Sequence, residues 1–255
     1  MPFRSLGALP DRHDSRDHIF ESIPRAFIGA IPPSVDMRNW CTPVRDQGQQ
    51  GSCTGFALTA LREFLEKKSG TPNPPVVLSP AFVYYEERKR EGSIGDCDAG
   101  AYPRDGFKVL KAMGACPETD DAYTDGACAA PTRHAVTDAK MYSVASYQRI
   151  TTLSGLKQAL AYGDGCVIGI AVYEGFESPQ ARATGHIPMP APNEGFLGGH
   201  ALFCCGYKDD AMYAGGGYLI VKNSWSTGFG DQGYVYLPYD YVIPKLTSDI
   251  WTAAA

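Results

Sequence analysis

The sequence lacks any apolar run long enough to cross a membrane. Hydrophobic residues make up 44% of its 255 positions, but they never approach the roughly 18 consecutive apolar residues that a membrane-spanning helix needs. Residues 1–30 also lack the apolar core of about 7–15 residues that marks a secretory signal peptide. We therefore expect no membrane partner, while a secreted and a cytoplasmic location both stay open.

An excess of basic residues is missing as well. The chain carries 23 Lys and Arg against 28 Asp and Glu, a net charge of −5. Nucleic-acid-binding proteins usually present a clustered basic face, so we expect no nucleic-acid partner. The length is sufficient for a core of ordinary size, in one domain or in two small ones with a cleft between them. We expect a monomer.

What the sequence does contain is a glycine-rich stretch, residues 47–56, that delivers Cys53 to the start of a predicted helix. Ser52 is a suitable N-cap, apolar residues follow at helical spacing, and Gly70 lies at the far end. The first turn of a helix has unpaired N–H groups and the positive end of the helix dipole, and both favour an anion. We therefore expect a partly exposed Cys53 thiol with a depressed pKa, as a nucleophile requires.

Three further residues fit catalysis by this thiol. A cysteine nucleophile needs a histidine and an orienting Asn or Asp far along the chain, and His200 and Asn223 lie 147 and 170 residues after Cys53. Gln47, on the glycine-rich loop, can turn its side-chain amide toward an oxyanion beside the sulfur. The alternative reading of Cys53 is a small apolar residue packed at a helix start, but this reading leaves the other three residues unexplained.

Blocks of sequence around these residues resemble the papain family of cysteine peptidases, and its bacterial branch in particular. They occur in the family's order and extend over nearly everything after residue 31. The blocks are Pro33–Arg38, Thr42–Gly48, Gly51–Cys53, Gly199–Ala201, Asn223–Trp225, Gly228–Gly230 and Gly233–Tyr234. The resemblance implies an α+β fold of two domains, one mainly helical and one an antiparallel β-sheet or barrel, with the active-site cleft between them.

The resemblance also implies a role for each site residue. Cys53 is similar to the nucleophile, His200 to the general acid/base, Asn223 to the amide that orients the imidazole and Gln47 to the oxyanion-hole donor. Trp225 would shield the Asn223–His200 hydrogen bond. The implied reaction is hydrolysis of a peptide or protein substrate through a thioester, with no cofactor and no metal.

Substrate-binding residues are implied in the same way. The backbone of Ala99, Gly100 and Ala101 would pair with an extended peptide at the cleft edge, where small residues allow close approach. Gly199 and Trp225 would contact the substrate beside His200. A plain surface turn explains residues 99–101 nearly as well.

Other functions fit less of the sequence. The same Cys-His-Asn set serves an acyl or amide transferase, and the scaffold serves a catalytically silent interaction protein, although all four catalytic positions hold competent residues. Gly228–Gly233 matches a dinucleotide-binding fingerprint, but a strand-like run follows it where a helix is needed. A zinc site of His200, Cys204 and Cys205 is not favoured because adjacent strand residues point to opposite faces.

The cysteines raise a separate question. Eight are many for a reducing compartment, and seven remain if Cys53 stays free. Family members from plants and animals usually carry a cysteine where this chain has Gln50, so the usual bridge to the loop around Cys97 cannot form. Cys116 and Cys128 flank a loop rich in Asp, Pro and Gly, and we hypothesise a disulfide between them.

The composition and residue pattern divide the chain into three parts. Residues 31–135 are predicted to be mainly helical and to carry Cys53, with helices at 79–90 and 102–114 and a solvated charge run at 86–90. Residues 136–255 read as a β domain with His200 and Asn223. Short runs rich in Val, Ile, Tyr and Cys predict strands at 141–150, 166–172, 200–207, 218–223 and 234–237. In that part only 153–162 reads as a helix, and 174–199 reads as a loop over the cleft.

Residues 1–30 are too polar to form a core and predict an arm laid on the main body. The arm could cover the cleft and inhibit the chain, with Phe20, Ile23 and Phe27 filling substrate pockets. The alternative is that it packs on the back of the β domain.

Overall fold

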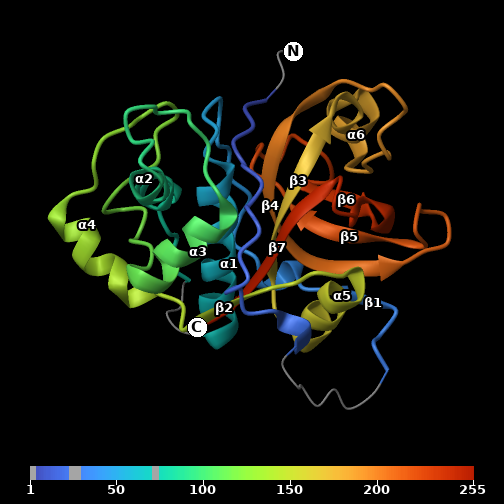
Figure 1. Ribbon diagram of the computed structural model, residues 1–255, viewed down its shortest axis with the longest axis horizontal. Coiled ribbons are helices and arrows are strands. Elements are labelled where there is room, and N and C mark those ends of the chain that lie inside the picture. Colours follow the sequence, from blue (N-terminus) through green and yellow to red (C-terminus); the bar gives the residue numbers. More distant parts are fainter. Residues whose placement is uncertain (1–3, 23–29, 71–74) are drawn as a thin grey trace.

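The computed structural model describes residues 4–22, 30–70 and 75–255. Helices and an antiparallel sheet form two halves that lie side by side (Figure 1), which confirms the predicted α+β fold. Within the described ranges, no helix combines the length and the apolar character that crossing a bilayer would require. The division at residues 30 and 135 stays a prediction.

The helical half begins with α1 (Cys53–Ser69), which ends before Gly70 at a φ of 77°. Ser52 precedes α1, but its hydroxyl forms a 2.8 Å hydrogen bond with Tyr123 Oη and does not cap the helix. Ser79 does cap α2, since its Oγ accepts from Phe82 N at 3.0 Å. The other helices of this half are α2 (Pro80–Glu91), α3 (Pro103–Ala112), α4 (Arg133–Asp138) and the 3₁₀ turn η3 (Ala139–Tyr142).

The second half is a sheet with strand order β2-β7-β3-β4-β5-β6, and β1 adds to β4. All of these strand pairs are antiparallel. The strands are β1 (Ser34–Asp36), β2 (Ser146–Arg149), β3 (Cys166–Tyr173), β4 (Phe196–Asp209), β5 (Gly217–Lys222), β6 (Tyr234–Pro238) and β7 (Thr247–Ala254). Helices α5 (Leu153–Tyr162) and α6 (Pro179–Thr184) and the 3₁₀ turns η1 (Phe20–Ser22), η2 (Arg38–Trp40), η4 (Glu174–Glu177) and η5 (Tyr239–Tyr241) complete the elements.

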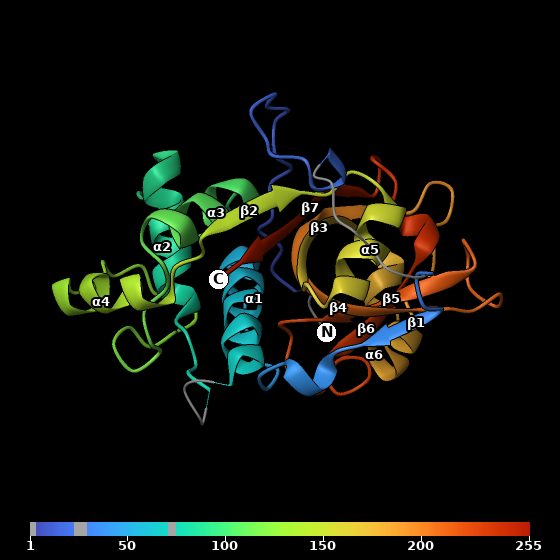
Figure 2. The same ribbon diagram turned by 90° about the horizontal axis from the view of Figure 1, so that it is seen from below.

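Helix α1 joins the two halves. It packs against α2 on one side and against β4 on the other, and Figure 2 shows it between the remaining helices and the sheet. Its first twelve residues, Cys53 to Phe64, are buried. A helix buried on both sides carries its first residue into the interface, which is why Cys53 comes next to β4 and His200.

Three features of the local structure differ from the predictions. The segment 174–199 is not one loop, because it contains η4, α6 and the start of β4, so 153–162 is not the only helix in the second half. Strand β7 was not predicted. The charge run 86–90 is not a solvated face, since Glu87 and Arg88 are 0% and 1% exposed.

Candidate active site

Cys53 is the first residue of α1, and its side chain meets the strand that carries His200. The backbone N–H of Ala201 donates to Cys53 Sγ at 3.4 Å. Because Ala201 directly follows His200 on β4, this contact fixes the thiol beside the histidine. The contact joins residues 148 positions apart.

The Cys53 thiol is fully buried, and burial raises its pKa to about 11. The prediction of a partly exposed thiol with a depressed pKa was therefore wrong for this state of the chain. The helix terminus and N–H groups from Ala201, Gly7 and Thr54 favour the thiolate, but desolvation is the larger effect. Gly7 belongs to the N-terminal arm, so the arm takes part in covering the thiol.

His200 is held in one orientation by two neighbours. Its Nε2 lies 2.8 Å from Asn223 Oδ1, which also accepts from the Ser224 N–H at 2.8 Å. The Trp225 ring stacks on the imidazole, with 4.6 Å between ring centroids and 21° between planes. Burial lowers the pKa of His200 to about 4. No other described residue hydrogen-bonds Nδ1, so this nitrogen is available to accept a proton.

Gln47 is anchored across the boundary between the two halves. Its backbone N–H donates to Ser224 O at 2.9 Å, and its Oε1 accepts from Ser224 Oγ at 2.6 Å. The amide Nε2 donates to Gln50 O at 2.9 Å and to Ser5 O at 3.2 Å. The Ser5 carbonyl therefore occupies the donor that an oxyanion would need.

The N-terminal arm runs between the two halves, as Figure 1 shows in dark blue. Ala8 N donates to Gly199 O at 3.0 Å, and Leu9 N donates to Ala101 O at 2.9 Å. Ala101 N donates to Gly7 O at 2.8 Å. A Cβ added at Gly7 would lie only 1.8 Å from Gly51 O, so this glycine lets the arm pass close to the Cys53 loop.

The predicted substrate-binding residues lie along the arm. Gly100 has a φ of +72°, and a Cβ there would lie 2.4 Å from Gly7 O. Ala99, Gly100 and Gly199 line the same groove as the arm, and Trp225 lies against His200. The groove also has apolar walls, formed by residues that sequence reasoning missed: Ile170, Tyr173, Phe196 and Leu246.

One disulfide holds the loop at residues 97–101. Cys97 pairs with Cys128, so the predicted Cys116–Cys128 bridge was wrong, and Cys116 is a buried free thiol. Gln50 adds to this support, because its Nε2 donates to Cys97 O at 2.9 Å and to Ala127 O at 3.0 Å. The amide at position 50 thus binds the loop that a cysteine there would have bridged.

The arm has polar anchors that the sequence did not reveal. Asp11 N donates to Asp249 Oδ2 at 3.0 Å, and Trp251 Nε1 donates to Asp11 Oδ2 at 2.9 Å. Arg104 forms a 2.7 Å ion pair with Asp17. The cluster of Arg and Asp at residues 11–17 was the only signal for them in the sequence.

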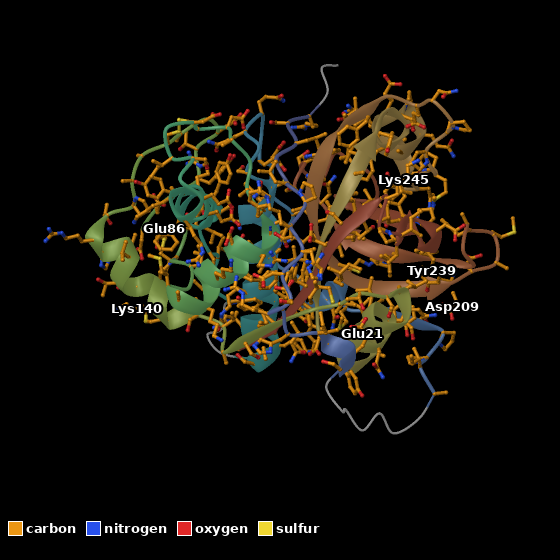
Figure 3. All side chains as sticks on the ribbon, viewed as in Figure 1. Glu21, Glu86, Lys140, Asp209, Tyr239 and Lys245 are labelled. Atoms are coloured by element: carbon orange, nitrogen blue, oxygen red, sulfur yellow. A yellow bond between two sulfur atoms is a disulfide. The ribbon has the colours of Figure 1, made fainter. Side chains whose placement is uncertain are left out.

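The expected apolar anchor Phe20 does not fill the cleft. Phe20 is buried, but it lies in η1 next to Glu21, which accepts from Thr151 N at 2.9 Å just before α5. Figure 3 labels Glu21 at this place. Ile23 and Phe27 lie outside the described residues. The arm therefore enters the cleft through residues 4–10 and rests on the β half through residues 20–21.

Residues 31–245 match the family model described as papain family cysteine protease. An uncharacterized peptidase C1-like protein of Acanthamoeba polyphaga mimivirus is 36% identical over 81% of this chain and 68% of its own length. Digestive cysteine proteinase 2 of Homarus americanus is 30% identical over 83% of this chain and 63% of its own length. The chain thus spans about two thirds of these relatives.

A solved structure is similar over nearly the whole of both chains. Xylellain, a cysteine protease from Xylella fastidiosa, aligns with a TM-score of 0.88 and 33% identity, and the alignment covers 100% of this chain and 98% of that one. The family match over residues 31–245, this similarity and the arrangement of Cys53, His200 and Asn223 agree. The chain belongs to the papain family of cysteine proteases.

Proposed function

We propose that this chain hydrolyses peptide bonds in peptide or protein substrates through a thioester on Cys53. The observation that carries the proposal is the position of the Cys53 thiol beside a histidine that Asn223 orients. Sγ accepts from the N–H that follows His200, while Nε2 of the ring is engaged by Asn223 and Nδ1 is free among the described residues. The ring is thus oriented to exchange a proton at one nitrogen only.

The four residues would act in sequence. His200 Nδ1 takes the Cys53 proton, and the resulting thiolate attacks the substrate carbonyl carbon. Gln47 Nε2 and the Cys53 N–H donate to the oxyanion. His200 then protonates the leaving amine, and water hydrolyses the thioester with the same imidazole as base. Asn223 keeps the ring aligned throughout.

We also propose that residues 4–10 hold the chain inactive. Ser5 O already accepts from Gln47 Nε2, and Gly7, Ala8 and Leu9 use the backbone groups of Ala101 and Gly199 that a substrate would need. Burial in this state raises the pKa of Cys53 and lowers that of His200. The pair is consequently neutral under the arm, and departure of the arm would restore water and the reactive ion pair.

The acceptor of the acyl group, water or an amine, distinguishes a peptidase from a transferase. A peptide ester and an amine acceptor are incubated with a chain that begins at Asp11 and so lacks the segment in the cleft, and the products are identified by mass spectrometry. We expect the free acid as the main product and no product after iodoacetamide has alkylated Cys53. A main amide product would identify a transferase. Absence of both products before alkylation, from a chain whose Cys53 iodoacetamide then labels fully, would contradict an enzymatic role.

The bacterial branch of the family is the finer assignment that we propose. It is supported by the similarity to xylellain over nearly the full length of both chains. The relatives reported above also include a viral protein and a lobster protein.

A further inference from the structure

Two carboxylates flank Trp225 at one end of the cleft. Asp46 pairs with Trp225 as an antiparallel β-bridge. Glu177 follows Phe176, whose ring packs edge-on against Trp225 with 5.6 Å between centroids. Because Trp225 stacks on His200, both acids lie on the histidine side of the cleft.

The arm places a basic residue between these acids. Arg4 Nη1 forms a 3.0 Å ion pair with Asp46 Oδ1, and the Arg4 backbone N–H donates to Glu177 Oε1 at 3.0 Å. Arg4 directly precedes Ser5, whose carbonyl accepts from Gln47. The arm therefore shows how a positively charged residue fits next to the oxyanion donor.

Each of the two acids has a cationic partner, Arg4 for Asp46 and Arg182 for Glu177. The Glu177 side chain is fully buried, and its other oxygen contacts Arg182. Without Arg4, Asp46 would have no ion-pair partner among the described residues. Glu177 Oε1 would also lose its hydrogen-bond donor, the Arg4 N–H, and a carboxylate oxygen that stays buried without a donor is costly. A substrate that displaces water from this place must therefore supply a donor to Glu177, and it meets an unpaired carboxylate at Asp46.

The chemistry of the leaving group tells which part of a substrate reaches these acids. His200 protonates the leaving amine, so the amine half of the substrate must lie on the side of His200 and Trp225. We propose that Asp46 forms an acidic subsite for an Arg or Lys side chain in the segment that follows the cleaved bond, while Glu177 accepts from a backbone N–H of the same segment. The inference rests on the proposed peptidase function and names a substrate class for it.

A purely structural role accounts for only part of these contacts. Asp46 Oδ1 accepts from Gly48 N at 2.9 Å, and this bond supports the loop before Cys53. An Asn at position 46 keeps that bond through its amide oxygen but loses the charge. The variant Asp46→Asn therefore separates support of the loop from attraction of a cation.

The test uses internally quenched peptides that differ only in charge. Arg or citrulline is placed at the first, second or third residue after the cleaved bond, and kcat/KM is measured. The protein is the chain that begins at Asp11, so that the arm neither blocks the cleft nor supplies a guanidinium of its own. We expect a preference of roughly fivefold for Arg over citrulline at one of these positions, the size of an exposed ion pair.

When Asp46→Asn is added, kcat/KM should become about equal for the Arg and citrulline peptides. The preference should persist in the control Asp138→Asn, which makes the same change of charge on α4 at the outer end of the helical half (Figure 1). Equal kcat/KM for Arg and citrulline at all three positions would overturn the subsite, and so would a preference that survives Asp46→Asn.

A second readout separates the subsite from the peptidase proposal. If neither peptide is cleaved, the peptidase proposal fails, and protection of Cys53 from iodoacetamide decides the subsite. Stronger protection by the Arg peptide than by the citrulline peptide supports the acidic subsite. Equal protection, or none, overturns it.

Discussion

The carbonyl oxygen of Ser5 accepts a hydrogen bond from Gln47 Nε2 at 3.2 Å. The amide that we assign to the oxyanion is thus occupied by the chain's own N-terminal arm. The same arm contributes an N–H to the Cys53 sulfur through Gly7. Residues 5–7 therefore cover two groups that the proposed reaction needs, the Cys53 thiol and the oxyanion donor Gln47.

Removal of residues 1–10 should expose the site. A chain that begins at Asp11 keeps the anchors at Asp11, Asp17 and Glu21 but loses the segment in the cleft. We expect alkylation of Cys53 by iodoacetamide to become at least about tenfold faster, because a tethered blocker acts at high effective concentration. A chain that begins at Arg4 is the control and should react like the full chain. Unchanged alkylation with a lowered melting temperature would mean that the arm is only a structural strap.

Docking of the arm should weaken as pH rises. Burial and the neighbouring Asp249 raise the pKa of Asp11 from 3.8 to about 8. Because the docked arm then holds a proton that a free arm lacks between about pH 4 and pH 8, docking is strongest in acid and is weakened progressively as pH rises through 8. The charged groups that face Asp11 are Asp249 on β7 and Arg104 on α3.

The variant Asp11→Asn tests this linkage, since an amide cannot ionise. At about pH 3.5, below the ordinary Asp pKa of 3.8, the free arm also holds the proton, and the full-length variant and the parent should alkylate at similar rates. At pH 9 the variant should react more slowly, because its arm stays docked. A ratio of the two rates that does not change with pH would rule out Asp11 as the titrating group.

Loss of His200 should cost more activity than loss of Asn223. His200 transfers protons, so His200→Ala should lower kcat by about 10²–10⁴. Asn223 only orients the ring, and Trp225 continues to stack on it, so Asn223→Ala should cost at least about tenfold less. Equal losses of kcat in the two variants would contradict these roles.

The Cys97–Cys128 bridge should stabilise the chain. The bridge closes a loop with a sequence separation of 31, for which chain entropy predicts about 3–4 kcal/mol. Cys128→Ala should lower the free energy of unfolding in urea by that amount. Reductant is the control: it should destabilise the parent and leave the variant unchanged, and the opposite pattern would argue for a different pairing.

Much of the local structure was predictable because its signals are local. Helix α5 begins at Leu153 and ends at Tyr162, as predicted, because a capping threonine and a terminal glycine bracket an apolar repeat. The cap at Ser79 and the turn at Gly70 follow from the same rules. The sequence order of the family blocks was enough to nominate Cys53, His200 and Asn223.

What could not be predicted depends on partners distant in the sequence. β7 contains Asp249, an unfavourable strand residue that becomes acceptable because Arg149 pairs with it at 3.1 Å and the Asp11 N–H donates to it at 3.0 Å. The pairing of Cys97 with Cys128 depends on which loops meet in space. The raised pKa of Cys53 depends on its burial by segments distant in the sequence, since a helix terminus alone predicts the opposite shift. Local patterns contain none of this information.

The replacement Cys53→Ser tests the central claim most directly. Serine keeps the size of the side chain but lacks a thiol that can ionise in the catalytic range, so the thiolate route closes. Hydrolysis of one fluorogenic peptide is measured for the chain that begins at Asp11, with and without the replacement, and circular dichroism checks that both are folded. We predict that kcat/KM falls by at least about a hundredfold. A folded variant that retains more than about a hundredth of the activity would contradict the assignment of Cys53 as the nucleophile.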